Sequence, residues 1–264
     1  MIKTVKKVIL SSLSILGISF VLWLILLLNP GLSYANKTQV DFVNIYHNQA
    51  LETETEAVIR DAISILKKSD LYSDEVAIHF CLNDDKLYPN LHPFAGQPLA
   101  YAFLNKTIAK NCKLNFGKNI AKTQWAINEE EVRKFNLTWL LAHEFTHNLQ
   151  YRADRNYVIR STMGSLNWKL EGHAEYIARE FKGDGLLKAK IERFLLEEQQ
   201  EFKGLPVFEL EDGTQQILSY YKYALAIQYL MEEKGLNFEQ ICTNETDLDV
   251  LFDEMIDWKN TMTE

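Results

Sequence analysis

The residues best suited to chemistry form one five-residue stretch, His143-Glu144-Phe145-Thr146-His147. In a helix, two histidines four positions apart lie on one side, one turn above the other. Their imidazoles can then converge on a single zinc ion. Glu144 is rotated by about 100° from His143 around the helix axis, so it is a poor third ligand but can reach a water molecule held on the metal. Zinc lowers the pKa of that water towards about 7, and the Glu144 carboxylate can accept its proton.

The alternative without a metal for this stretch is a pair of surface or capping histidines on an ordinary helix. Leucines and a phenylalanine supply a buried face around the motif, and unpartnered polar side chains are costly to bury beside such a face. A catalytic zinc ion also takes three protein ligands and leaves a fourth position open. The next predicted helix should therefore supply the third ligand.

That helix carries two carboxylates, Glu171 and Glu175, which are four residues apart and face the same way. One can bind the metal, and the other can accept the free ring N–H of a ligating histidine and so fix its tautomer. Taken alone, such a pair is better explained as the solvated acidic face of an amphipathic helix. Beside a His-Glu-x-x-His helix, the metal-binding interpretation is favoured.

Together the two stretches, Ala142–Gln150 (AHEFTHNLQ) and Trp168–Tyr176 (WKLEGHAEY), resemble the gluzincin metallopeptidases. The likeness is to those members whose two helices read HExxH and W-x-x-EG-x-A-E-Y. It extends over roughly residues 130–235 and is specific over the two motifs only. The 23 residues between His147 and Glu171 leave the branch of the family undetermined.

The resemblance implies a set of roles and a fold. His143, His147 and Glu171 would bind Zn²⁺, Glu144 would act as the general base, and Glu175 would support a zinc-bound histidine. The implied fold is zincin-like: a small N-terminal sheet packed on the HExxH helix, followed by a mostly helical C-terminal subdomain.

Hydrolysis also needs a hydrogen-bond donor for the developing oxyanion, besides the metal itself. The stretch Ser219–Ala226 (SYYKYALA) is the expected source, because related zinc peptidases resemble it in carrying a tyrosine near the start of such a helix. We select Tyr221 first and Tyr220 second, with His173 as a rival donor. The alternative is that these tyrosines only pack in the core, as tyrosines at helical spacing commonly do.

The first thirty-five residues predict a targeting or anchoring segment. Three lysines precede an uncharged run, Val8–Leu28, whose 21 residues would form a helix about 30 Å long, the thickness of a bilayer core. Lysines at its N-terminal end favour an orientation that leaves residues 36–264 outside the cytoplasm. The length favours a retained anchor, whereas Pro30, Gly31 and the small residues Ser33 and Ala35 allow secretion after cleavage near Ala35.

Composition excludes several other classes of protein. Hydrophobic residues make up 47% and charged residues 24% of the 264 residues, which is ordinary for a globular chain. The net charge of −8 becomes −11 for residues 36–264, which argues against a general nucleic-acid binder, because such proteins normally need a basic face to neutralise phosphates. Three cysteines are too few for a disulfide scaffold, although Cys81 and Cys112 could pair in an oxidising compartment.

The pattern along residues 36–264 predicts one α+β domain. A polar lead-in (36–51) precedes a helix (52–68), a strand (75–82), a loop (83–97) and short strands within 99–126. A helix should begin with Asn128 as its N-cap and run to about Tyr151, and the last 115 residues should be almost wholly helical. We place those helices near 165–181, 186–203, 214–234 and 246–261.

These features together predict a membrane-anchored or secreted zinc-dependent peptidase that acts on peptides or proteins. A first alternative is a membrane-tethered binding or assembly protein that keeps a structural zinc site. Structural sites usually close with four protein ligands and would not need Glu144. A second alternative is a helical membrane-associated module without metal.

Overall fold

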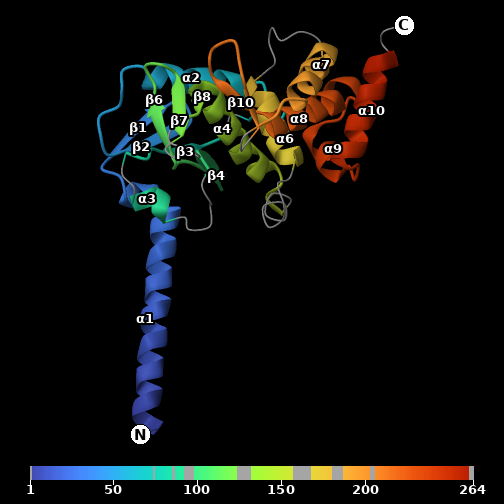
Figure 1. Cartoon of the computed structure of the whole chain (residues 1–264). Helices are drawn as coiled ribbons and strands as arrows, with labels where there is room; N and C mark the ends of the chain where they lie inside the picture. The colour runs from blue at the N-terminus through green and yellow to red at the C-terminus, as the bar shows by residue number, and fades with distance from the viewer. Residues whose placement is uncertain are drawn as a thin grey trace.

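The computed structural model describes residues 2–73, 75–84, 87–91, 98–123, 132–156, 168–179, 187–202 and 206–261. Helix α1 (Ile2–Leu28) extends away from a body in which the strands lie on one side and the C-terminal helices on the other (Figure 1). A short 3₁₀ turn (Pro30–Leu32) and helix α3 (Leu87–Asn90) lie at the junction. The mixture of a sheet-rich first half and a helical second half is the α+β, zincin-like layout that the sequence predicts.

The main sheet has five strands in the order β1-β2-β3-β5-β4. Strands β2, β3 and β5 run parallel, whereas β1 and β4 pair antiparallel at the two edges. The strands are β1 (Asn36–Val40), β2 (Val43–His47), β3 (Ile78–Cys81), β4 (Ala100–Phe103) and β5 (Lys106–Ala109). The expectation of a polar lead-in over 36–51 is therefore wrong. Val40, Val43 and Ile45 are fully buried, but two five-residue strands joined by a tight turn give too short an apolar pattern to recognise.

Helix α2 (Thr55–Leu66) crosses from β2 to β3 and packs beside α4 (Leu137–Ala153). Its buried positions recur at helical spacing, so one face enters the core that the sheet shares with α4. The apolar residues among them are Val58, Ile59, Ala62, Ile63 and Leu66. The predicted helix over 52–68 is confirmed apart from its ends.

A second, three-stranded antiparallel sheet leads directly into α4. It consists of β6 (Cys112–Asn115), β7 (Ile120–Thr123) and β8 (Lys134–Asn136). The helix expected to begin at Asn128 instead begins at Leu137, because Asn136 is the N-cap and its side chain accepts a hydrogen bond from the backbone N–H of Trp139. Asn128 itself lies outside the described residues.

The C-terminal half contains α6 (Trp168–Arg179), α7 (Leu187–Glu198), α8 (Leu218–Gln228) with a π-helical turn (Tyr229–Glu233), α9 (Phe238–Thr243) and α10 (Leu248–Thr261). A hairpin of β9 (Val207–Glu209) and β10 (Gln215–Ile217) interrupts them, so the helix predicted over 214–234 begins late. Gly213, with φ of +73°, forms the hairpin turn. Residues 157–167 and 180–186, into which two predicted helices extend, lie outside the described residues.

Helices α6 and α8 approach closely at Gly172. A Cβ atom at this position would lie 2.6 Å from the backbone oxygen of Tyr223, which is closer than real Cβ contacts. Glycine therefore sets the distance between the two helices that carry Glu171 and Tyr220.

None of the three cysteines forms a disulfide in the structure. Cys81 and Cys112 are both buried, and neither forms a disulfide. The possible pairing of Cys81 with Cys112 is thus not realised, and burial raises the pKa of the Cys112 thiol to about 12.

Candidate metal centre and active site

Helix α4 presents different residues to its two neighbours. Leu141, Phe145 and Leu149 are almost fully buried in the core shared with the sheet, where the ring of Phe145 packs edge-on against Phe80 of β3. His143 and His147 lie towards α6, because their ring nitrogens contact the carboxylates of that helix. The apolar residues thus fix α4 against the sheet and leave its two histidines facing the next helix.

Three candidate ligand atoms form a small triangle. His143 Nε2 and His147 Nε2 are 3.1 Å apart, and Glu171 Oε2 lies 3.3 Å from the first and 3.4 Å from the second. Zinc bonds of about 2.0–2.2 Å in tetrahedral geometry place neighbouring ligand atoms about 3.3 Å apart. The three atoms therefore match one face of a zinc tetrahedron, and the residues fit the metal that their types suggest.

The outer nitrogens of both imidazoles are hydrogen-bonded to acceptors. His143 Nδ1 lies 3.0 Å from Glu175 Oε2, and His147 Nδ1 lies 2.8 Å from Gln150 Oε1. Each Nδ1 therefore carries a proton, which leaves each Nε2 with a lone pair when the ring is neutral. Two lone pairs and a carboxylate oxygen then face one another, and such an arrangement requires a cation or a proton between them.

The charges around these atoms favour a proton in this place when no metal is bound. Burial opposes a charge on His143, but the hydrogen bonds and charges of Glu171 and Glu175 outweigh burial and raise the pKa of His143 to about 10. Burial alone would raise the pKa of Glu171, yet His147 and His143 hold it well below its usual range. The centre therefore keeps a negative carboxylate beside rings that attract positive charge, as a divalent cation site does.

Glu175 is held in place on its other side by two residues. Its Oε1 accepts hydrogen bonds from Arg179 Nε and from Gln216 Nε2, the latter at 2.9 Å. The guanidinium of Arg179 in turn lies over the ring of Trp139, 4.8 Å from its centroid. Sequence reasoning assigned Glu175 as the partner of a zinc-bound histidine but missed Gln216, because this residue lies on the hairpin that the sequence pattern did not reveal.

Glu144 borders a cleft of about 250 Å³ next to the triangle. Strand β4 and helices α4, α6 and α8 line this cleft, which includes Tyr101, Glu144, His147, Glu171 and Tyr220. Glu144 is buried, and its Oε2 has no hydrogen-bond partner among the described residues. Burial raises the pKa of Glu144, although His143 and His147 partly offset the effect. A buried carboxylate oxygen without a partner at the edge of a cleft is well suited to contact a water molecule.

The two candidate tyrosines of α8 point in different directions. Tyr220 lines the cleft, and its ring stacks on His143 with 5.8 Å between centroids and an interplanar angle of 6°. Tyr221, our first choice, is 3% exposed and packs against Phe208 in the C-terminal helical core. The structure does not bring Tyr221 to the cleft, because adjacent helical residues differ by about 100° in direction.

His173, the rival donor, does not reach the cleft either. It is fully buried, packs against the ring of Phe238, and contacts Gln150 and Asp70. Sequence reasoning could have suggested Gln150 by its position three residues after His147 on the same helix face, whereas nothing in the sequence indicates Asp70.

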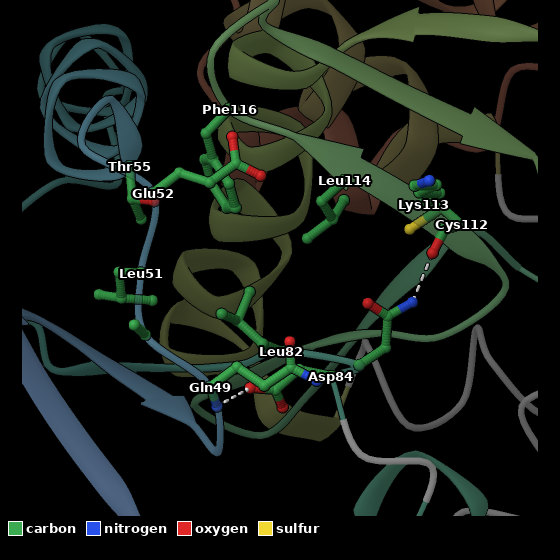
Figure 2. Close-up of a pocket in the computed structure, with 12 residues that line it drawn as sticks. Gln49, Leu51, Glu52, Thr55, Leu82, Asp84, Cys112, Lys113, Leu114 and Phe116 are labelled. Carbon is green, nitrogen blue, oxygen red and sulfur yellow. Dashed lines mark hydrogen bonds between the residues drawn. The ribbon is translucent and has the colours of Figure 1, made fainter.

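A second pocket of about 400 Å³ lies between the loop before α2, the end of β3 and strand β6 (Figure 2). Its two carboxylates serve the backbone of neighbouring loops. Asp84 accepts hydrogen bonds from the N–H groups of Asn48 and Gln49 at 2.6 and 2.8 Å, and Glu52 accepts from Gly117 at 3.1 Å. Across the part of the chain that the structure describes, no second group of His, Cys, Asp and Glu is arranged to hold a metal.

An α+β body with two histidines one turn apart, a carboxylate from the next helix and a partly open cleft has the features of a zinc metallopeptidase. A family model described as Collagenase, for a family of zinc metallopeptidases, matches residues 115–258, which is more than half of the chain. The chain therefore belongs to the collagenase family of peptidases, and zinc is its metal. The match covers all of the residues that form the triangle.

No curated protein and no solved structure matches the chain.

Proposed function

We propose that this protein is a zinc-dependent peptidase that hydrolyses peptide bonds outside the cytoplasm, with His143, His147 and Glu171 as metal ligands and Glu144 as general base. The observation that carries the proposal is the triangle of ligand atoms beside the buried carboxylate of Glu144. Bound zinc supplies Lewis-acid polarisation of the scissile carbonyl and lowers the pKa of water. Everything else in the reaction depends on residues of the chain.

Glu144 removes a proton from the attacking water and then transfers it to the leaving amine. Its burial favours this role, because a buried carboxylate with a raised pKa is a stronger base than a solvated one. Tyr220 donates its O–H to the carbonyl oxygen as negative charge develops there. Burial, strengthened by the charges of Glu171 and Glu144, raises the pKa of Tyr220 well above its usual range, so the phenol keeps its proton throughout the physiological range.

Strand β4 is the proposed binding surface for the peptide backbone. It is the last strand in the order of the five-stranded sheet, and Ala100, Tyr101 and Ala102 line the cleft beside Glu144. An extended substrate can lie along such an edge, where main-chain hydrogen bonds provide affinity without strong sequence preference. This placement supports a peptide or protein as the substrate.

Helix α1 is the proposed membrane anchor. Its Ser11–Leu28 segment is long and apolar enough to cross a membrane, and most of that segment is exposed. The last residues of α1 and the segment that follows it pack into the folded body. Tyr88 Oη donates to the carbonyl of Leu27 at 2.8 Å, and Tyr34, which is 7% exposed, donates to the carbonyl of Leu82 at 2.6 Å. Cleavage near Ala35 would remove Tyr34 from its contacts with Tyr46 and Tyr88, so we favour retention.

The test is a peptide-cleavage assay on the full chain in detergent, with and without a zinc chelator, together with Glu144→Gln. We expect chelation to abolish cleavage and added zinc to restore it. Glu144→Gln should keep one zinc per chain and lose about 10²–10⁴-fold in turnover. If chelation unfolds the protein and no peptide is cleaved under any condition, the rival proposal of a structural zinc site in a binding protein is favoured.

A further inference from the structure

A line of buried polar side chains begins at His147 and leads away from the cleft. His147 Nδ1–H donates to Gln150 Oε1 at 2.8 Å, and Gln150 is fully buried. Because an amide offers its oxygen on one side and its two N–H donors on the other, this bond fixes which way the Gln150 amide points.

The N–H₂ group of Gln150 then contacts helix α6 twice. Gln150 Nε2 donates to the carbonyl of Leu170 at 2.9 Å and lies 3.2 Å from His173 Nδ1. Leu170 directly precedes Glu171. The Gln150 side chain is therefore hydrogen-bonded both to the candidate ligand His147 and to the residue before the candidate ligand Glu171. The helix of the two histidines and the helix of the third ligand are thereby joined at the centre itself.

His173 continues the line with a defined tautomer. Since its Nδ1 accepts from Gln150, its proton is on Nε2, which lies 3.2 Å from Asp70 Oδ1. Asp70 Oδ2 accepts the backbone N–H of Phe238 at 3.1 Å, and the ring of Phe238 packs against His173 with 4.6 Å between centroids. Each N–H donor in this series faces an acceptor, so all of the hydrogen bonds from His147 to Asp70 run in the same direction.

We propose that Gln150, His173 and Asp70 are positioning residues that hold His147 and the Glu171 helix in the geometry that binds zinc. The proposal rests on the zinc site of the proposed function. It adds that part of the metal affinity resides in residues that touch neither metal nor substrate. Loss of such supporting hydrogen bonds lowers metal affinity by about 10–100-fold in zinc sites of this kind.

The experiment measures zinc affinity by chelator competition on the full chain in detergent, and the visible absorption spectrum after substitution with Co²⁺. The variant Gln150→Met removes the hydrogen bonds at nearly constant shape. Its matched control is Gln228→Met, because Gln228 is also buried but bonds to Lys190 and Glu232 on the C-terminal helices. We expect Gln150→Met to weaken zinc binding about 10–100-fold and to alter the Co²⁺ spectrum, while Gln228→Met leaves both unchanged.

A second variant keeps the proposal testable if Gln150→Met does not fold. His173→Phe retains a ring against Phe238 but removes both of the hydrogen bonds of His173, and we expect weaker zinc binding in the same direction. The proposal is overturned if the folded variants bind zinc as tightly as Gln228→Met does and show the wild-type Co²⁺ spectrum. Failure of the wild-type chain itself to bind zinc would instead contradict the proposed function, so it is measured first.

Discussion

Glu171 and Glu175 differ in which ring nitrogen they contact, although they lie one turn apart on the same helix. Glu171 Oε2 faces the Nε2 atoms of both histidines, whereas Glu175 contacts Nδ1 of His143 and accepts hydrogen bonds from Arg179 and Gln216. A metal ion between the Nε2 atoms would therefore bind Glu171 directly and Glu175 only through His143.

Glu171→Ala should consequently lose more zinc than Glu175→Ala. Removal of a direct ligand leaves two, whereas removal of Glu175 leaves three ligands and one poorly oriented imidazole, at a cost of about 10–100-fold in affinity. Metal analysis of both purified variants by mass spectrometry provides the comparison. If Glu175→Ala were the more depleted of the two, the third ligand would be Glu175.

Tyr220→Phe should lower turnover about 10²–10³-fold, which is the usual effect of removing one oxyanion donor. Zinc content should stay unchanged, because the ring of Tyr220 stacks on His143 and its hydroxyl is not a ligand. Tyr221→Phe is the matched control and should keep wild-type kinetics, since its ring lies in the helical core. Equal kinetics for the two variants would remove Tyr220 from the mechanism.

Residue spacing in the sequence predicts which side chains share a helix face, whereas the choice of Glu171 over Glu175 came from the resemblance to the gluzincins. Positions i and i+4 on a helix must share a face, so the pairs His143 with His147 and Glu171 with Glu175 follow from local geometry. The choice between Tyr220 and Tyr221 depends on the rotation of α8 against its neighbours, which no local pattern encodes. Asp70 meets His173 across 103 residues of sequence, and only the tertiary structure brings them together.

At the scale of elements, the close approach of α6 to α8 depends on Gly172. Gly172→Ala should destabilise the protein by about 1–3 kcal/mol, because the added Cβ would meet the backbone of Tyr223 rather than a flexible side chain. The displacement of α6 should also weaken zinc binding through Glu171. Thermal unfolding with and without zinc measures both effects, and an unchanged melting temperature in both conditions would contradict the tight contact.

The elements that the sequence pattern missed are short. Strands β8, β9 and β10 have three residues each, too few for the alternation of apolar and polar side chains to be recognised. The long helix α2 and the two motif-bearing helices were predicted, because their apolar residues repeat over several turns. The start of α4 was placed at the wrong asparagine, since Asn128 and Asn136 are equally good N-caps by residue type.

At the scale of the whole molecule, hydrogen bonds join the end of α1 to the folded body. Trp23 Nε1 donates to the carbonyl of Leu91 at 2.9 Å, and the carbonyl of Leu27 accepts from Tyr88, so the end of α1 is bonded to the α3 region. As the proposed membrane anchor, a helix joined in this way would hold the body next to the membrane. Residues 36–264, which carry a net negative charge, would then face the aqueous side without adhering to anionic lipids.

The intact mass of the protein purified from the membrane fraction should therefore include residues before Ser33. Cleavage near Ala35 would remove Tyr34 from the aromatic cluster, and replacing Tyr34 by Ala should lower the melting temperature of the full chain, because a buried aromatic ring contributes about 3–5 kcal/mol. Detection of a soluble form that begins at Asn36 as the major product would show that the segment is a cleaved signal.

The central claim is that one zinc ion lies between His143, His147 and Glu171. An anomalous difference map at the zinc absorption edge, from crystals of the full chain, tests it most directly. We expect one peak within bonding distance of both Nε2 atoms and of a Glu171 oxygen, with Glu175 outside bonding distance. Absence of a peak there after incubation with zinc, or a peak bound to other residues, would contradict the claim.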